Sequence, residues 1–92
     1  AVLTRDEVVT PWAVAGFEAL VPDDFAGLLR HAPELVLLGS GVRQRFPAPH
    51  LLRPLFEARI GVETMATAAA CRTFNILSGE GRRVVAALIV VR

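Results

Sequence analysis

The feature that most constrains the fold is an uninterrupted apolar run at residues 84–91 of this 92-residue chain. Its eight residues fall far short of the ~20 that a helix needs to cross a bilayer, so the run does not predict insertion into a membrane. It also lacks the polar alternation of a strand with one solvated face, which predicts a strand buried on both faces. Such a strand needs further strands beside it and helices above and below it.

Two more segments have the character of strands in the same sheet. Residues 35–38 form a short continuous apolar run, as expected for a strand covered on both faces. Residues 62–65 are predicted to be a second central strand, parallel to the strand at 35–38. With helices predicted between the strands, the order from Leu35 onward is strand, helix, strand, helix, strand, which indicates an α/β domain with helices packed on a sheet.

Three helices are predicted from apolar spacing and from the residues at their ends. The first opens at residues 22–24, where proline suits the first helical position and two aspartates favour the positive end of the helix dipole. The second starts near His50 and stops at Gly61. The third covers residues 68–77, with Thr67 as its N-cap. The apolar faces are expected to be Phe25, Leu28, Leu29 and Ala32 in the first helix; Leu51, Leu52, Leu55 and Phe56 in the second; and Ala69, Ala70, Phe74 and Leu77 in the third.

The N-terminal segment predicts a hairpin. Residues 2–3 end one strand, residues 4–7 form a polar turn, and residues 8–12 form a second strand. Pro11 cannot donate to a ladder of hydrogen bonds, so the second strand is expected at an edge of the sheet. Because the sequence begins with Ala1 rather than with methionine, we expect residues to be missing upstream and the strand pair to be truncated.

Composition narrows the function classes. Hydrophobic residues form 53% of the chain, and a chain this short is predicted to fold around one core, as a single domain over residues 1–92. The formal net charge is +1, so no overall field attracts nucleic acid. A single cysteine fits a reducing compartment, which is the cytoplasm in a bacterium or the mitochondrial matrix in a eukaryote.

A glycine turn follows the strand at 35–38. Gly39, Ser40 and Gly41 can present successive backbone N–H groups to an anion. The dinucleotide fingerprint is absent, because Gln44 stands where its third glycine belongs, and a P-loop is absent for want of its Gly-Lys-Ser/Thr ending. A tight turn out of a central strand is the favoured interpretation, and a ligand or partner surface at the strand end remains the alternative.

The residues after this turn are a candidate contact surface for a protein. Arg43 and Arg45 flank Gln44, and Phe46 follows as an apolar anchor. Arginine and aromatic residues concentrate at the centres of interfaces. The competing interpretation is a solvated arginine pair over a phenylalanine of the core.

Cys71 and Asn75, both in the third helix, complete the candidates. The helix dipole and Arg72 favour a reactive thiolate at Cys71, but the sequence places neither of the two histidines beside it. A buried cysteine acting as a small hydrophobe is therefore favoured. Asn75 must satisfy its amide either with nearby backbone, which is the favoured interpretation, or with a ligand or partner. These residues predict no catalytic centre, no metal site and no cofactor.

Two pairs of segments carry a family resemblance. They are PELVLLGSG at 33–41 with RQRFP at 43–47, and GVE at 61–63 with TAAACRTFNIL at 67–77. They resemble the small domain family that contains the mitochondrial respiratory complex I assembly factor 3. The resemblance implies a three-layer α/β domain with a mixed central sheet and an N-terminal strand pair, and a non-enzymatic role of the mitochondrial member in assembling a membrane respiratory complex.

The resemblance also bears on catalysis. Family members commonly carry an acidic residue at the position of Ala66 and a tyrosine at that of Phe74, so a carboxylate cap or a phenol hydrogen bond is absent here. A catalytic role that rests on those two positions is therefore disfavoured, and the chain is more consistent with a protein that is not an enzyme.

The favoured hypothesis is an interaction module without catalysis, whose contact surface runs from Gly39 to Phe46. Its partners are expected to be proteins, either subunits of a respiratory complex or a second copy of the chain. The alternative is a small-molecule or anion-binding domain, or an enzyme, that uses the Gly39 to Gly41 turn with Cys71 or Asn75. Nucleic-acid binding through the arginines is least supported, because the net charge is close to zero.

Overall fold

Strand β5 (Val84–Leu88) lies inside a five-stranded sheet in the computed structural model, which describes residues 2–4, 8–9 and 17–89. The strand order is β2-β1-β5-β3-β4, and β3 runs parallel to both β4 and β5, whereas β1 is antiparallel to β2 and β5. The other strands are β1 (Val2–Leu3), β2 (Val8–Val9), β3 (Leu35–Gly39) and β4 (Gly61–Met65). The predicted α/β fold with a mixed sheet and an N-terminal strand pair is therefore confirmed, while Pro11 lies outside the described residues.

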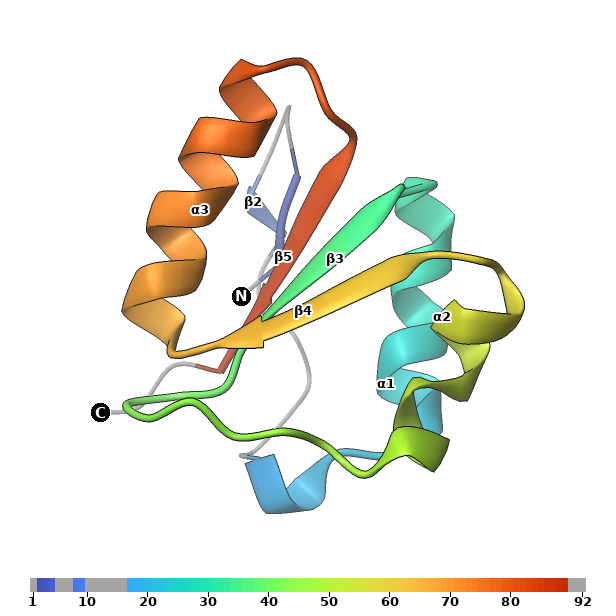
Figure 1. Cartoon of the computed structure of the whole chain (residues 1–92). Coiled ribbons are helices and arrows are strands. Elements are labelled where there is room, and N and C mark those ends of the chain that lie inside the picture. Colours follow the sequence, from blue (N-terminus) through green and yellow to red (C-terminus); the bar gives the residue numbers. More distant parts are fainter. Residues whose placement is uncertain (1, 5–7, 10–16, 90–92) are drawn as a thin grey trace.

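Helices cover both faces of this sheet and give three layers. Helix α3 (Thr67–Gly79) packs on one face, and α1 (Pro22–Ala26) and α2 (Arg53–Glu57) pack on the other (Figure 1). Short 3-10 helices η1 (Phe17–Ala19), η2 (Gly27–His31) and η3 (Pro49–Leu52) precede or continue the helices of the second layer.

Alternate residues of β3 and β5 face the two helical layers, and this explains why neither strand alternates with polar residues. The core between the sheet and α1 and α2 contains Phe25, Leu28, Val36, Leu38, Leu55, Val85 and Ala87. The core between the sheet and α3 contains Leu35, Leu37, Ala70, Phe74, Val84, Ala86 and Leu88.

The structure corrects the position of β4. The sequence predicts a second central strand at residues 62–65, but among the described strands β4 pairs only with β3 and forms an edge of the sheet. Gly61 and Glu63 are exposed, and Val62, Thr64 and Met65 are half-buried. Because Glu63 is exposed, its charge stays in water and carries no desolvation penalty.

The first helix begins as predicted and ends earlier. Proline occupies its first turn, and the Asp24 carboxylate accepts a hydrogen bond of 2.9 Å from the Val21 N–H, which satisfies a donor at the helix start. Regular α-helix stops at Ala26, and the chain continues as 3-10 helix to His31. The tighter winding of the 3-10 segment moves Leu29, expected on the apolar face, to an exposed position.

The second helix differs from its prediction at both ends. It starts as the 3-10 turn η3, and Pro54 lies in the first turn of α2, where the missing N–H has no cost. Phe56, expected in the core, is 52% exposed. Gly61 does not stop the helix, because α2 ends at Glu57 and Arg59 makes the turn at a φ of 60°.

The third helix is longer than predicted and is capped differently. It starts at Thr67 and reaches Gly79, and Ala66 rather than Thr67 is the N-cap residue. Ala70 and Phe74 are buried against the sheet as predicted. The Thr67 side chain does not cap its own helix and is instead bonded to two neighbouring segments.

Candidate binding surface

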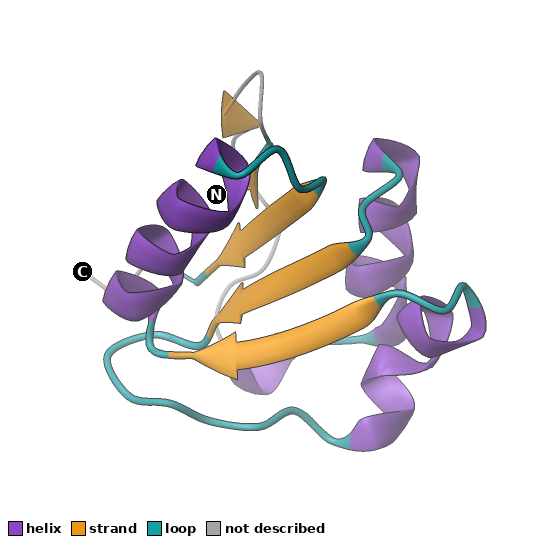
Figure 2. Cartoon of the chain, turned by 45° about the horizontal axis from the view of Figure 1, so that its top comes forward, coloured by secondary structure: helices purple, strands orange, loops and turns teal. Residues whose placement is uncertain are grey.

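The carboxyl ends of the three parallel strands lie side by side at one end of the sheet, and the loop of residues 40–48 starts there (Figure 2). Gly39 is packed so closely there that a Cβ would lie 2.9 Å from Leu88 Cδ2 and 3.0 Å from the Thr67 Cα. Gly41 has a φ of 103°, which side-chain-bearing residues rarely adopt. Both glycines of the turn are thus required by geometry.

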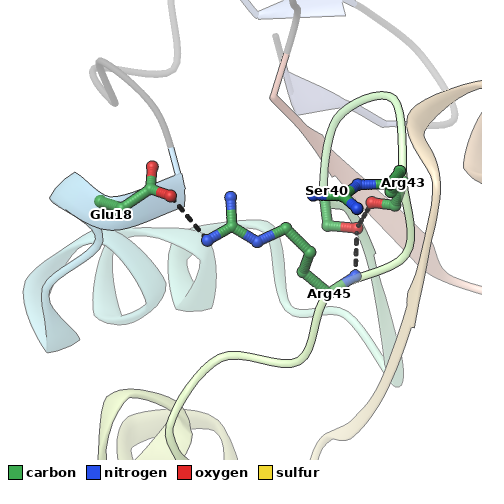
Figure 3. Close-up of polar contacts among 4 residues, drawn as sticks. All are labelled: Glu18, Ser40, Arg43 and Arg45. Atoms are coloured by element: carbon green, nitrogen blue, oxygen red, sulfur yellow. Dashed lines mark hydrogen bonds and ion pairs between the residues drawn. The ribbon is translucent and has the colours of Figure 1, made fainter.

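Ser40 holds the loop in a closed shape. Its buried hydroxyl accepts a hydrogen bond of 2.9 Å from the Arg45 N–H and donates one of 2.8 Å to the Arg43 carbonyl, with the Met65 carbonyl at 3.1 Å (Figure 3). Its backbone N–H donates to the Met65 carbonyl at 2.9 Å. One side chain therefore joins the loop to itself and to the end of β4.

Thr67 makes the second connection. Its hydroxyl accepts a hydrogen bond of 2.9 Å from the Gly41 N–H and donates one of 2.7 Å to the Ile89 carbonyl. Its own N–H donates to the Gly41 carbonyl at 2.8 Å. Because the protein itself uses the N–H groups of Ser40 and Gly41, the turn does not present them to an anion. The anion-cradle alternative for this turn is therefore not favoured.

Arg45 turns away from Arg43 and toward η1. Its guanidinium forms an ion pair of 2.6 Å with the Glu18 carboxylate (Figure 3). The same group lies 4.1 Å from the centroid of the Phe17 ring. The hydrogen bond from Arg45 lowers the pKa of the Glu18 carboxyl, with smaller contributions from a backbone hydrogen bond and from the arginine charge. The two arginines predicted to form an exposed fork have separate roles, and Arg45 fastens the loop.

What remains exposed on the loop is an apolar and cationic group. Val42 is 79% exposed and Phe46 is 74% exposed, and Arg43 is also exposed between them in the chain. Gln44 is exposed too, and its amide donates a hydrogen bond of 2.8 Å to the Thr64 carbonyl of β4. Phe46 is not a core residue, so the core interpretation of this phenylalanine is wrong.

The two helix candidates differ from each other in burial. Cys71 is half-buried against the core on the α3 side, as expected of a small hydrophobe. Asn75 is exposed, so solvent can satisfy its amide and the expectation of a partner within the fold is wrong. Among the hydrogen bonds and ion pairs of the described part of the chain, none joins either side chain to the loop.

Two broader features concern metals and membranes. Within residues 2–4, 8–9 and 17–89, no three His, Cys, Asp or Glu side chains gather in a way that could hold a metal ion. None of the helices in this described part is long and apolar enough to cross a membrane.

A groove beside β4 was not predicted. It has a volume of about 520 Å³ and lies between the loop and the exposed strand, lined by Gln44, Phe46, Pro47, Leu52, Val62, Glu63, Thr64 and Met65. The sequence signal for an exposed strand beside this groove was the mixture of polar and apolar residues in β4, because a strand covered on both faces does not contain a glutamate.

These features define a three-layer α/β domain with a hydrogen-bonded, partly apolar loop at the carboxyl ends of its parallel strands. Residues 1–89 match the family described as "Protein of unknown function (DUF498/DUF598)", and the chain belongs to this family. The resemblance stated from the sequence motifs is thereby confirmed, since relatives in the comparison include complex I assembly factors.

Three relatives illustrate the family. Bovine "NADH dehydrogenase (ubiquinone) 1 alpha subcomplex assembly factor 3" is 37% identical over 83 residues, which are 88% of this chain and 45% of that protein. An NMR structure from Xanthomonas campestris has 42% identity and a TM-score of 0.84, over 96% of this chain and 67% of that one. A Bordetella parapertussis crystal structure has 42% identity and a TM-score of 0.85, over 96% and 75%. The chain spans about half the length of the bovine relative.

Proposed function

We propose that this chain is a non-enzymatic interaction module that assists the assembly of a larger protein complex, with residues 39–46 as its contact surface. The observation that carries the proposal is the exposure of Val42 and Phe46, at 79% and 74%, on a loop that Ser40 and Thr67 hold in place. The assembly-factor names of relatives such as the bovine protein support the same role.

The loop has the chemistry of an interface centre. The exposed Phe46 and Arg43 offer a large apolar area and a forked donor, and aromatic residues and arginine are enriched in interface centres. Because hydrogen bonds already fix the loop backbone, the loop loses little conformational entropy when a partner binds. The partner is a protein, either a subunit of a respiratory complex or another component of the assembly, in the cytoplasm or the mitochondrial matrix.

The experiment compares two doubly substituted proteins in affinity capture from the source cell. The first, Arg43→Ala with Phe46→Ser, removes the exposed arginine and phenylalanine of the loop and leaves its hydrogen bonds and the Glu18 ion pair intact. The matched control, Arg83→Ala with Ile76→Ser, removes an exposed arginine that precedes β5 and an exposed apolar residue of α3, both outside the loop.

We expect the loop variant to capture at least about tenfold less of the specific partner than the unmodified protein does, because an aromatic residue and an arginine at an interface centre are both removed. The control should capture as much as the unmodified protein. Equal capture by both variants, or no partner enriched over a control resin, would contradict the proposed contact surface. Circular dichroism of both variants establishes that the fold is kept.

A further inference from the structure

Strand β4 presents unpaired backbone groups along its outer edge. The Gly61 N–H bonds to Glu34 on the β3 side, and the Met65 carbonyl bonds to Ser40 on the same side. Because successive residues of a strand direct their backbone groups to opposite sides, those of Val62 and Thr64 point outward. Within the described residues, the N–H groups of Val62 and Thr64 have no partner in the fold.

One of these outward groups, the Thr64 carbonyl, already has a hydrogen-bond partner within the fold. The Gln44 amide donates a hydrogen bond of 2.8 Å to the Thr64 carbonyl, where the N–H of a neighbouring strand would bond. Gln44 is exposed, so the side chain can swing into water without breaking any packing. The amide therefore occupies a position that a backbone N–H from outside can take.

The groove beside this edge has the character of a binding site. Its volume of about 520 Å³ lies in the range of about 300–1,000 Å³ typical of binding pockets. Phe46 forms one wall from the loop, and Pro47 and Leu52 line the side nearest the second helical layer. The strand itself carries no proline, a residue that commonly protects an edge from pairing.

We propose that this groove binds an extended segment of a partner protein as an added strand on β4. The proposal rests on the proposed function and identifies how a partner would be held. Backbone hydrogen bonds to Val62 and Thr64 supply the pairing, and Gln44 yields the Thr64 carbonyl. This is the mode by which several peptide-binding domains extend a sheet.

The side chains of the groove define the chemistry of the segment. Val62 packs toward the core on the α1 and α2 side, so segment residues on that face meet Phe46 and Leu52 and should be apolar. Glu63 points to the opposite face and is exposed, so residues on that face should be basic. The segment is thus expected to alternate apolar residues with arginine or lysine.

The same glutamate disfavours a second copy of the chain. If two β4 strands paired antiparallel with all five residues overlapping, Glu63 of one copy would face Glu63 of the other. Like charges directly opposite each other destabilise a strand pair. A basic segment of another protein is therefore the occupant.

The test uses a synthetic acetylated peptide in which valine and arginine alternate, titrated into the ¹⁵N-labelled protein. We expect the amide signals of Val62, Thr64 and Phe46 to shift, and hydrogen exchange of the Val62 and Thr64 amides to slow. Two further peptides carry N-methyl groups, on the valines in one and on the arginines in the other.

An added strand directs every second N–H toward β4. Methylation of one set should therefore weaken binding at least about tenfold, while methylation of the other set leaves it nearly unchanged. If methylation of the valines weakens binding, the added strand runs antiparallel to β4. If methylation of the arginines weakens binding, the added strand runs parallel to β4. The substitution Gln44→Ala, which frees the Thr64 carbonyl, should tighten binding about two- to tenfold.

Several results would overturn the proposal. These are no signal change at β4 with the peptide at millimolar concentration, equal effects of the two methylated peptides, or shifts at β4 that appear on protein concentration alone. The last result would indicate self-pairing. If capture depends on Arg43 and Phe46 but the peptide leaves β4 unchanged, the proposed function stands and strand addition fails. If capture does not depend on them, the proposed function fails on its own.

Discussion

Strands β4 and β5 flank β3 on its two sides, both parallel to it and both five residues long, yet they differ in their relation to solvent. Every residue of β5 is buried, whereas none of β4 is. Both strands pair with the whole length of β3. The difference shows that position in the sheet, rather than pairing with β3, decides which strand contributes to the core and which remains available for binding.

The physical reason lies in the number of neighbours. β5 has β1 on its second side and helices over both faces, so a polar side chain there has no access to water. None of the strands that the structure describes lies on the second side of β4, and this outer side opens into the groove. A central strand therefore requires apolar residues throughout, and an edge strand tolerates Glu63 and Thr64.

The largest expected effect comes from placing a charge in each strand. Ala86 of β5 is fully buried, so Ala86→Asp should destabilise the protein by about 4 kcal/mol or more, which can unfold a small domain. The matched substitution Thr64→Asp in β4 should cost less than about 1 kcal/mol. Urea unfolding followed by circular dichroism measures both, and similar losses from the two would contradict the assignment of β4 as the solvated strand.

An intermediate effect is expected from two threonine substitutions. Thr67→Val leaves the Gly41 N–H and the Ile89 carbonyl without their side-chain partner, which should cost about 1–3 kcal/mol. Thr64→Val keeps a β-branched residue in β4 and should change the free energy of unfolding by less than about 0.5 kcal/mol. Hydrogen exchange at Gly41 should accelerate in the first variant alone, and unchanged protection there would show that the hydroxyl does not hold the loop.

The smallest effect concerns the ion pair that fastens the loop beside β4. Since the folded-state pKa of Glu18 is lowered, the pair contributes stability above the ordinary glutamate pKa. This contribution is lost as pH falls through the lower, folded value. NMR titration should show the Glu18 carboxyl titrating below an ordinary glutamate, together with acid-induced shifts of the Arg45 side-chain signals.

The substitution Glu18→Gln is the control for this titration. It should remove the acid-induced change at Arg45 while leaving β5 signals unaltered. A Glu18 midpoint at the ordinary value in the unmodified protein, or persistence of the Arg45 change in the variant, would show that the ion pair is not maintained in solution.

Local residue patterns were sufficient for much of the fold. The apolar runs at residues 35–38 and 84–91 predicted strands buried on both faces, and Pro22 located the start of a helix, because these properties depend on a few neighbouring residues. Such patterns could not show that β4 lies at an edge. That assignment depends on which strands pair, and the partners are distant in the sequence.

The sequence predicted which residues form the candidate surface, but only part of how they are arranged. The sequence identified the glycine turn, Arg43 and Phe46 as a contact candidate. It did not reveal that Arg45 is bonded to Glu18, which lies 27 positions away. It likewise missed the bonds of Thr67 to the loop and to the end of β5.

The layered α/β character and the composition of the loop follow from local sequence, because hydrophobic periodicity and turn residues act over short distances. Three properties follow from the packing of the folded domain: the turn uses its own N–H groups, Phe46 faces solvent, and β4 keeps an open edge with a groove beside it. These properties arise when segments far apart in the chain meet, and that meeting depends on the packing of the whole domain.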